Sequence, residues 1–391
     1  MEIGEVFLIS ALVFSAVAIV AFVAGLRRQK LLKIAAKALY GYAAMLTHAF
    51  FLLLYYFLTR DFSVKYVFEH SDAYLPLLYT ISAVWAGKEG SLLLWAWFVA
   101  LLNVAFFRIE KRKRGETDRV TATSLAISSS IVLFFSVLLV TTSNPFSRLD
   151  FTPVHGMGLN PMLRTLEMAL HPLAIFVGYA AVTFPFALAI SGVLYRENWI
   201  KRARSWLLFA WISLSIGIFL GAWWAYKTLG WGGFWAWDPV ENASLLPWLT
   251  ASALIHGMIV EERRRGLKTL NYFLAVITFN LVILATFITR SGIVSSVHAY
   301  EADAETFYLI PITAATLLGI VVWFVRRSSN TPLKGTREAM VFVNMLVLML
   351  TLLVILLGTF SPLLGAPVDR SYYEKLFPLW QPRRSCRYMF S

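Results

Sequence analysis

A short loop near the middle of the chain carries most of the residues whose chemistry stands out. Six tryptophans fall within 26 residues, and residues 231–238 read Trp-Gly-Gly-Phe-Trp-Ala-Trp-Asp. Gly232 and Gly233 let the backbone approach a flat object closely. The neighbouring rings offer apolar area for stacking, worth about 0.5–1.5 kcal/mol per ring pair beyond burial. The pattern predicts a shelf for a large planar aromatic ligand, built from Trp231, Trp235 and Trp237.

The end of the loop carries the signals that start a helix. Asp238 is expected to cap that helix, with Pro239 at its first position and Glu241 at its third. Tryptophan is common at membrane interfaces, which explains one or two such rings. It does not explain six rings interleaved with glycine and followed by a cap, so we favour a ligand shelf mounted on a capped helix.

Histidine is the other residue type that could do chemistry here, because neutral imidazole is a common axial ligand of haem iron. His171 and His298 lie on either side of the Trp-rich loop in the sequence. His256 falls within an apolar stretch, where an ionisable residue indicates function unless it merely donates to a neighbouring helix. His70 and His155 are interpreted as solvated loop residues. The sequence thus predicts two external iron ligands, His171 and His298, and a third candidate, His256, at membrane depth.

The elements that position these residues follow from composition. Of the 391 residues, 59% are hydrophobic and 15% are charged, whereas a soluble domain carries about 25% charged residues. Apolar blocks of close to 20 residues recur, which is the length needed to cross about 30 Å of hydrocarbon. Because backbone groups in lipid must be paired within their own segment, these blocks are expected to be helices. The predicted fold class is an all-α, polytopic membrane bundle.

Ten spans are expected, with a short interfacial or re-entrant helix over 73–86 before the third. We predict a single membrane domain over 1–360, with its external ligand-binding loop at 226–248, and an external tail over 361–391. The predicted spans are 5–26, 38–58, 90–107, 120–141, 171–194, 205–225, 244–260, 269–289, 306–325 and 339–360.

Charge distribution predicts the orientation. The net charge is +13, and 23 of the 35 Lys and Arg residues lie in every second loop. Basic residues mark the cytoplasmic side of a membrane protein, so both termini and the Trp-rich loop are expected outside the plasma membrane. The basic excess is therefore a topology signal, and no nucleic-acid partner is expected.

The Trp-rich stretch resembles the signature of the haem-handling superfamily used in cytochrome c assembly, and its extension Asp-Pro-Val-Glu-Asn-Ala-Ser over 238–244 resembles the cytochrome c maturation protein F family. The resemblance covers about residues 40–360. Further matching segments occur in the family's order: 61–67, 87–95, Gly158-Leu159-Asn160-Pro161, His171-Pro172, Arg290-Ser291-Gly292 and Val297-His298-Ala299.

The resemblance implies a system I haem lyase component. Such a protein receives haem from an extracytoplasmic haem chaperone and presents it to apocytochrome c, with other cytochrome c maturation subunits as partners. It then helps to form thioether bonds as part of a holocytochrome c synthase. His171 and His298 match the family's external ligands of transient haem. Trp231, Gly232, Gly233, Trp235, Trp237 and Asp238 match its loop.

His256 matches a transmembrane ligand of a resident b-type haem. The family's second ligand to that haem lies in a later helix, but no histidine follows His298, so His48 or another chain is left as its partner. Arg290 and Arg164 are candidates to pair with haem propionates, against the alternative that they are simply solvated.

Three rival functions remain at this point. A haem exporter would need a polar route across the membrane, at which only His256 and His48 hint. A subunit of a proton-pumping or quinone-reducing complex predicts charged relays within the spans, and a scaffold for assembly partners predicts no cofactor. Family members usually continue with further spans and an external domain. The chain is short by that standard, which fits either a truncated member or one half of a split protein.

Overall fold

The computed structural model describes residues 2–229, 233–264, 266–294, 296, 306–326, 335–365, 372–373 and 376. These residues form helices and connecting loops, and their only extended pairing is one bridge between Val64 and Arg148. The helices are α1 (Ile3–Gly25), α2 (Lys30–Thr59), α3 (Lys65–His70), α4 (Leu77–Ala83), α5 (Lys88–Arg114), α6 (Arg119–Thr141), α7 (Leu166–Tyr195), α8 (Ile200–Thr228), α9 (Pro239–Arg264), α10 (Lys268–Ser291), α11 (Leu309–Arg326) and α12 (Thr336–Phe360).

Ten of these helices are long and apolar enough to cross a membrane, and each overlaps one predicted span. The all-α prediction is therefore confirmed. Helix α4 falls within 73–86, where a short helix before the third span was expected. The six-residue helix α3 was not predicted.

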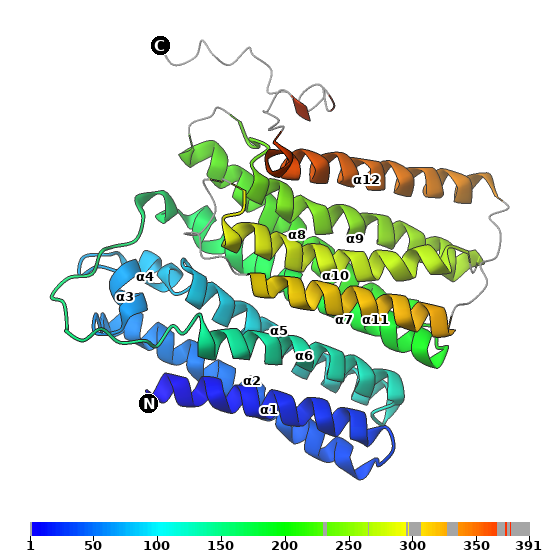
Figure 1. The fold of residues 1–391 in the computed structure, drawn as a ribbon, viewed down its shortest axis with the longest axis horizontal. Coiled ribbons are helices and arrows are strands. Elements are labelled where there is room, and N and C mark those ends of the chain that lie inside the picture. Colours follow the sequence, from blue (N-terminus) through cyan, green and yellow to red (C-terminus); the bar gives the residue numbers. More distant parts are fainter. Residues whose placement is uncertain are drawn as a thin grey trace.

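The long helices run side by side, so that successive connections alternate between the two ends of the bundle (Figure 1). The N-terminus, α3, α4, the N-terminal ends of α7 and α9 and the C-terminal end of α10 lie at one end. The connections rich in Lys and Arg follow α1, α5, α7 and α9 at the other end. This separation is the pattern on which the predicted orientation rests.

Helix α7 carries His171 and is fixed locally at its N-terminal end. The Thr165 hydroxyl accepts a hydrogen bond from Met168 N at 3.2 Å and caps the helix. Pro172 supplies no backbone N–H, so the helical ladder is interrupted next to His171. In the same turn, Trp85 Nε1 donates to the Ala169 carbonyl at 3.1 Å. The connection between α4 and α5 is thereby tied to the turn that presents His171.

Candidate functional site

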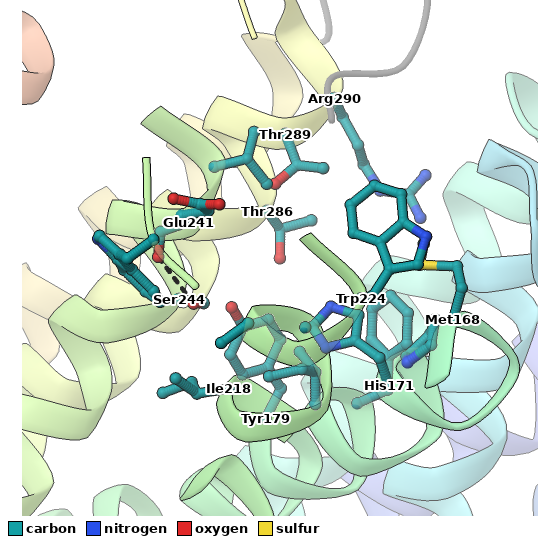
Figure 2. Close-up of a pocket in the computed structure, with 17 residues that line it drawn as sticks. Met168, His171, Tyr179, Ile218, Trp224, Glu241, Ser244, Thr286, Thr289 and Arg290 are labelled. Atoms are coloured by element: carbon teal, nitrogen blue, oxygen red, sulfur yellow. Dashed lines mark hydrogen bonds between the residues drawn. The ribbon is translucent and has the colours of Figure 1, made fainter. Parts of the chain in front are cut away.

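A cavity opens between α7, α8, α9 and α10 at the end of the bundle that holds the Trp-rich loop. Its volume is about 140 Å³. Figure 2 shows His171 and Trp224 on one side and Glu241 and Ser244 on the other. The walls are mainly apolar and aromatic, with a few polar groups, as is usual for small-molecule sites. The lining residues include His171, Phe176, Tyr179, Gly221, Trp224, Trp235, Glu241 and Arg290.

His171 is oriented by a bond between helices. Its Nδ1 lies 2.7 Å from the Gly217 carbonyl oxygen on α8. A carbonyl can only accept, so Nδ1 carries the proton and the lone pair of a neutral ring lies on Nε2. Histidines that bind metal commonly donate their other N–H in this way, because the bond fixes both tautomer and ring orientation. By contrast, Nδ1 of His48 and of His256 donates to a carbonyl four residues earlier in its own helix.

The surface of α8 is shaped to receive the His171 ring. Gly221 lies one turn beyond Gly217, and a Cβ atom on it would fall 2.8 Å from His171 Cε1 and 2.9 Å from Nδ1. Contacts under 3.0 Å force one group to move. The glycine therefore leaves the space that the ring occupies.

Replacing Gly221 with alanine is expected to displace the His171 ring and to weaken haem binding by about 10- to 100-fold, the range seen when the support of a metal ligand is altered. Haem titration of the purified protein measures the effect. Gly41→Ala on α2 is the matched control. The added Cβ would lie 2.9 Å from the Phe14 ring, a similarly close contact, and neither residue lines the cavity. Equal losses of affinity in the two variants would contradict the role given to Gly221.

The rings of the Trp-rich loop do not all face the same way. Trp235 is 7% exposed and lines the cavity. Trp237, 8% exposed, does not line it and instead stacks on Tyr373, with ring centroids 4.6 Å apart and an interplanar angle of 5°. Trp231 and Gly232 lie outside the described residues, and Gly233 is buried. Of the predicted shelf, the structure thus brings Trp235 to the cavity, and Trp224 on α8 joins it.

The predicted cap of α9 is confirmed. Asp238 Oδ2 accepts from Val240 N at 3.0 Å, and Pro239 is the first helical residue. Glu241 Oε2 reaches back to Ala236 N at 2.9 Å and to Asp238 N at 3.4 Å. These bonds order the end of the loop and hold it against the start of α9.

The segment after α10 contacts the same cap. The Ser296 hydroxyl lies 2.6 Å from Asp238 Oδ2. His298, two residues further on, is outside the described residues, so its predicted pairing with His171 stays a prediction. The Ser296 contact nevertheless brings the chain to the Trp-rich loop just before that histidine.

Of the two arginines considered for propionates, Arg290 reaches the cavity. It is 1% exposed, and its guanidinium donates to the Lys88 carbonyl at 3.0 Å and to Ser91 Oγ at 2.6 Å. The cation therefore lies in the cavity wall between α10 and α5. Arg164 donates to the Leu159 carbonyl at 2.9 and 2.7 Å and does not line the cavity.

His256 and His48 lie on different parts of the bundle. His256 is half-buried on α9, whereas His48 is exposed on α2, near the opposite side in Figure 1, with its ring against Phe7. The suggestion that His48 serves as the partner of His256 is therefore not supported. His155 is exposed and stacks on Tyr74, as expected for a loop residue.

Two residues of the site were missed in the sequence. Tyr179 lies deep in the cavity, with its hydroxyl directed inward (Figure 2). It follows His171 by eight residues, so helical periodicity could have placed it on the same face of α7. Tyr373 comes from a segment with no periodic pattern and reaches the Trp-rich loop only through the fold.

Comparison with known proteins shows the family. The family model described as "Cytochrome C assembly protein" matches residues 85–294, which is more than half of the chain. The chain belongs to this family. The matched region contains His171, the Trp-rich loop, His256 and Arg290.

Curated relatives and a solved structure agree with this membership. The chain is 40% identical over 345 residues to "Cytochrome c-type biogenesis protein CcmF" of Haemophilus influenzae, covering 85% of this chain and 53% of that protein. It is 38% identical to "Cytochrome c-type biogenesis protein ccl1" of Rhodobacter capsulatus, covering 88% and 54%. A solved structure titled "Cytochrome c Heme Lyase CcmF" superimposes with a TM-score of 0.78 at 28% identity, covering 95% and 58%. This family member, a multi-pass membrane protein of cytochrome c-type biogenesis, thus spans about half the length of the curated relatives it matches.

Proposed function

We propose that this protein binds haem at the external face of the plasma membrane and presents it for covalent attachment to apocytochrome c. The observation that carries the proposal is the His171 ring, oriented by the bond from its Nδ1 to the Gly217 carbonyl and set in an aromatic cavity beside the Trp-rich loop. The names of its relatives support the same biogenesis role.

The residues of the cavity suit haem in chemistry. Imidazole is an iron ligand, Trp235 and Phe176 offer aromatic faces, and Arg290 offers a cation for a propionate. The volume of about 140 Å³ is below the roughly 300–1,000 Å³ of typical ligand pockets. The cavity would therefore take only part of the macrocycle.

Each residue then has a defined task. His171 holds the iron, with His298 proposed as the opposing ligand. We propose that the Trp-rich loop covers one face of the ring and limits access of water, through Trp235 in the cavity wall and through Trp231, Gly232 and Gly233. Trp237 would act indirectly, through its edge-on contact with Trp235. Asp238 keeps the loop on the start of α9 through its cap. Orientation of this kind can by itself account for much of the lowering of a reaction barrier.

The attachment itself is an addition. Each cysteine thiol of the acceptor adds across a vinyl double bond of the bound haem, so that one C–S bond forms and the thiol proton passes to the other vinyl carbon. No oxidant is consumed, because the S–H bond and the C=C π bond are replaced by C–S and C–H bonds. An extracytoplasmic haem chaperone would deliver the haem, and other maturation subunits would hold the acceptor.

A second haem site is proposed at His256. Its Nδ1 donates to the Ser252 carbonyl at 2.7 Å, which leaves Nε2 as the ligating nitrogen of a neutral ring. The other described histidines lie on α2, α3, the 142–165 connection and the outer end of α7. A second axial ligand for a resident b-type haem would thus come from outside the described residues.

Reconstitution tests the proposed function. The chain is expressed with the remaining maturation proteins and a c-type cytochrome reporter, and haem covalently bound to the reporter is measured in denaturing gels. We expect attachment that depends on the chain and on the two cysteines of the reporter. Reporter that is fully loaded without the chain would contradict the proposal.

A further inference from the structure

The ring of Trp237 is held in place by Tyr373, which follows α12 in the sequence. Its ring lies nearly parallel to that of Tyr373, which is 3% exposed. The two rings belong to a small hydrophobic cluster separate from the main core, together with Leu246, Ile355 and other side chains. Trp235 belongs to the same cluster and lines the cavity, whereas neither Trp237 nor Tyr373 lines it.

The buried side-chain amide of Asn242 on α9 connects the Trp-rich loop, α12 and Tyr373. Asn242 is 0% exposed, and its Nδ2 donates to the Trp237 carbonyl and to Thr359 Oγ1, both at 3.1 Å. The amide also contacts the Tyr373 hydroxyl at 3.4 Å. The Thr359 hydroxyl donates to the Ile355 carbonyl at 2.7 Å, so its oxygen accepts from Asn242 and the orientation of the amide is fixed.

The backbone of Trp237 explains why such support is needed. Its φ is +61°, in the left-handed region that residues other than glycine seldom adopt. Conformations of this kind persist where the surroundings over-determine them, and they gather at functional sites. At Trp237 the surroundings include the stacked Tyr373 ring and the Asn242 amide on its carbonyl.

The contact between Tyr373 and Trp237 is connected to the cavity through Trp235. Trp235 lies edge-on to Trp237, with centroids 6.3 Å apart and an interplanar angle of 81°, and Trp235 lines the cavity. We propose that Tyr373 is a positioning residue, whose stacking on Trp237 sets the place of Trp235 in the cavity wall and so the strength and geometry of haem binding. This inference rests on the proposed function.

The structure makes room for the Tyr373 side chain beside α12. A Cβ atom on Gly358 of α12 would overlap the Tyr373 hydroxyl, so glycine at this position makes room for the phenol. Burial raises the pKa of Tyr373, because the charged phenolate is disfavoured away from water.

The test compares four variants of the full chain in lipid nanodiscs. Tyr373→Leu removes the stacked ring, Tyr373→Phe keeps it, and Gly358→Ala displaces it. Tyr372→Leu is the matched control, because this neighbour is half-buried and meets Tyr373 only edge-on. The readouts are the haem dissociation constant, the spin state of ferric haem from its optical spectrum, and, without haem, the ¹⁹F NMR signals of Trp235 and Trp237 after labelling with 5-fluorotryptophan.

Tyr373→Leu and Gly358→Ala are expected to weaken haem binding by about tenfold or more, as for other supporting residues of metal ligands, and to shift part of the haem from low to high spin. Tyr373→Phe and Tyr372→Leu should keep the wild-type spin state. The ¹⁹F signals of Trp235 and Trp237 should shift in Tyr373→Leu and in Gly358→Ala but not in the other two variants.

Two results would overturn the role of Tyr373. One is a Tyr373→Leu protein with wild-type affinity, spin state and ¹⁹F signals. The other is a Tyr373→Phe protein as impaired as Tyr373→Leu, since the ring would then not be the active feature. Failure of the wild-type protein to bind haem would instead refute the proposed function. The haem-free ¹⁹F comparison would still show whether Tyr373 positions Trp237 and Trp235.

Discussion

Replacing His171 with alanine is expected to weaken haem binding on the external face by more than the 10- to 100-fold that loss of a supporting residue produces. The reason is that, among the described histidines, His171 lines the cavity and has its ring oriented there by the Gly217 carbonyl, with Nε2 as the proposed iron ligand. Haem titration followed by the optical spectrum measures the loss, and attachment to a reporter cytochrome should fall in parallel.

Added imidazole sharpens this prediction. The alanine variant leaves the space of the ring empty beside the Gly217 carbonyl, so free imidazole should restore part of the binding and of the low-spin spectrum. His155→Ala is the control, since that histidine is exposed and stacks on Tyr74. Equal effects of the two substitutions, or no response to imidazole, would show that His171 is not the ligand.

The second large effect is expected at Arg290. Its guanidinium is a buried cation in the cavity wall, and hydrogen bonds to a charged group contribute about 1.5–3 kcal/mol. Arg290→Gln is therefore expected to weaken haem binding by about 10- to 100-fold. Arg290→Lys should lose less, because it retains the charge but not the planar guanidinium.

The choice of ligand separates binding from structure. Haem dimethyl ester lacks ionised propionates, so its affinity should hardly change in Arg290→Gln. Arg290 also donates to the Lys88 carbonyl and to Ser91 Oγ, which joins α10 to α5. If haem and its ester lose affinity equally, Arg290 acts by holding these helices together and the propionate contact is wrong.

The membrane architecture could be predicted because lipid imposes few solutions. Blocks such as Ile3–Gly25 and Leu166–Tyr195 are apolar over the thickness of a bilayer, so helix is the remaining choice. Helix ends were less accurate, since α7 begins at Leu166, five residues before the predicted 171. The cap at Thr165 and the polar end of the helix extend beyond the apolar block that defined the span.

The site was predictable where local chemistry decides it. The cap of α9 follows from Asp238, Pro239 and Glu241 in sequence, and the structure has it. The direction of the Trp237 ring does not follow, because it depends on a left-handed φ and on a ring 136 residues later, Tyr373. No period or spacing in the sequence connects these two residues.

The hydrogen bond between His171 and the Gly217 carbonyl on α8 could not be predicted from the sequence either. The sequence marks the residue as a ligand through its His-Pro context and resemblance, but not the carbonyl that orients it. Gly217 and Gly221 are ordinary glycines of an apolar helix until α8 packs on α7. Tertiary packing, and not local pattern, makes them the support of the His171 ring.

In the proposed function, haem is held on the external face by His171 together with His298. The most direct measurement is the optical spectrum of the purified protein expressed with haem supply, compared with a His171→Ala/His298→Ala double variant in which His256 is intact. We expect a Soret band whose external contribution disappears in the double variant while any signal dependent on His256 remains. A Soret band that is unchanged in the double variant would contradict it.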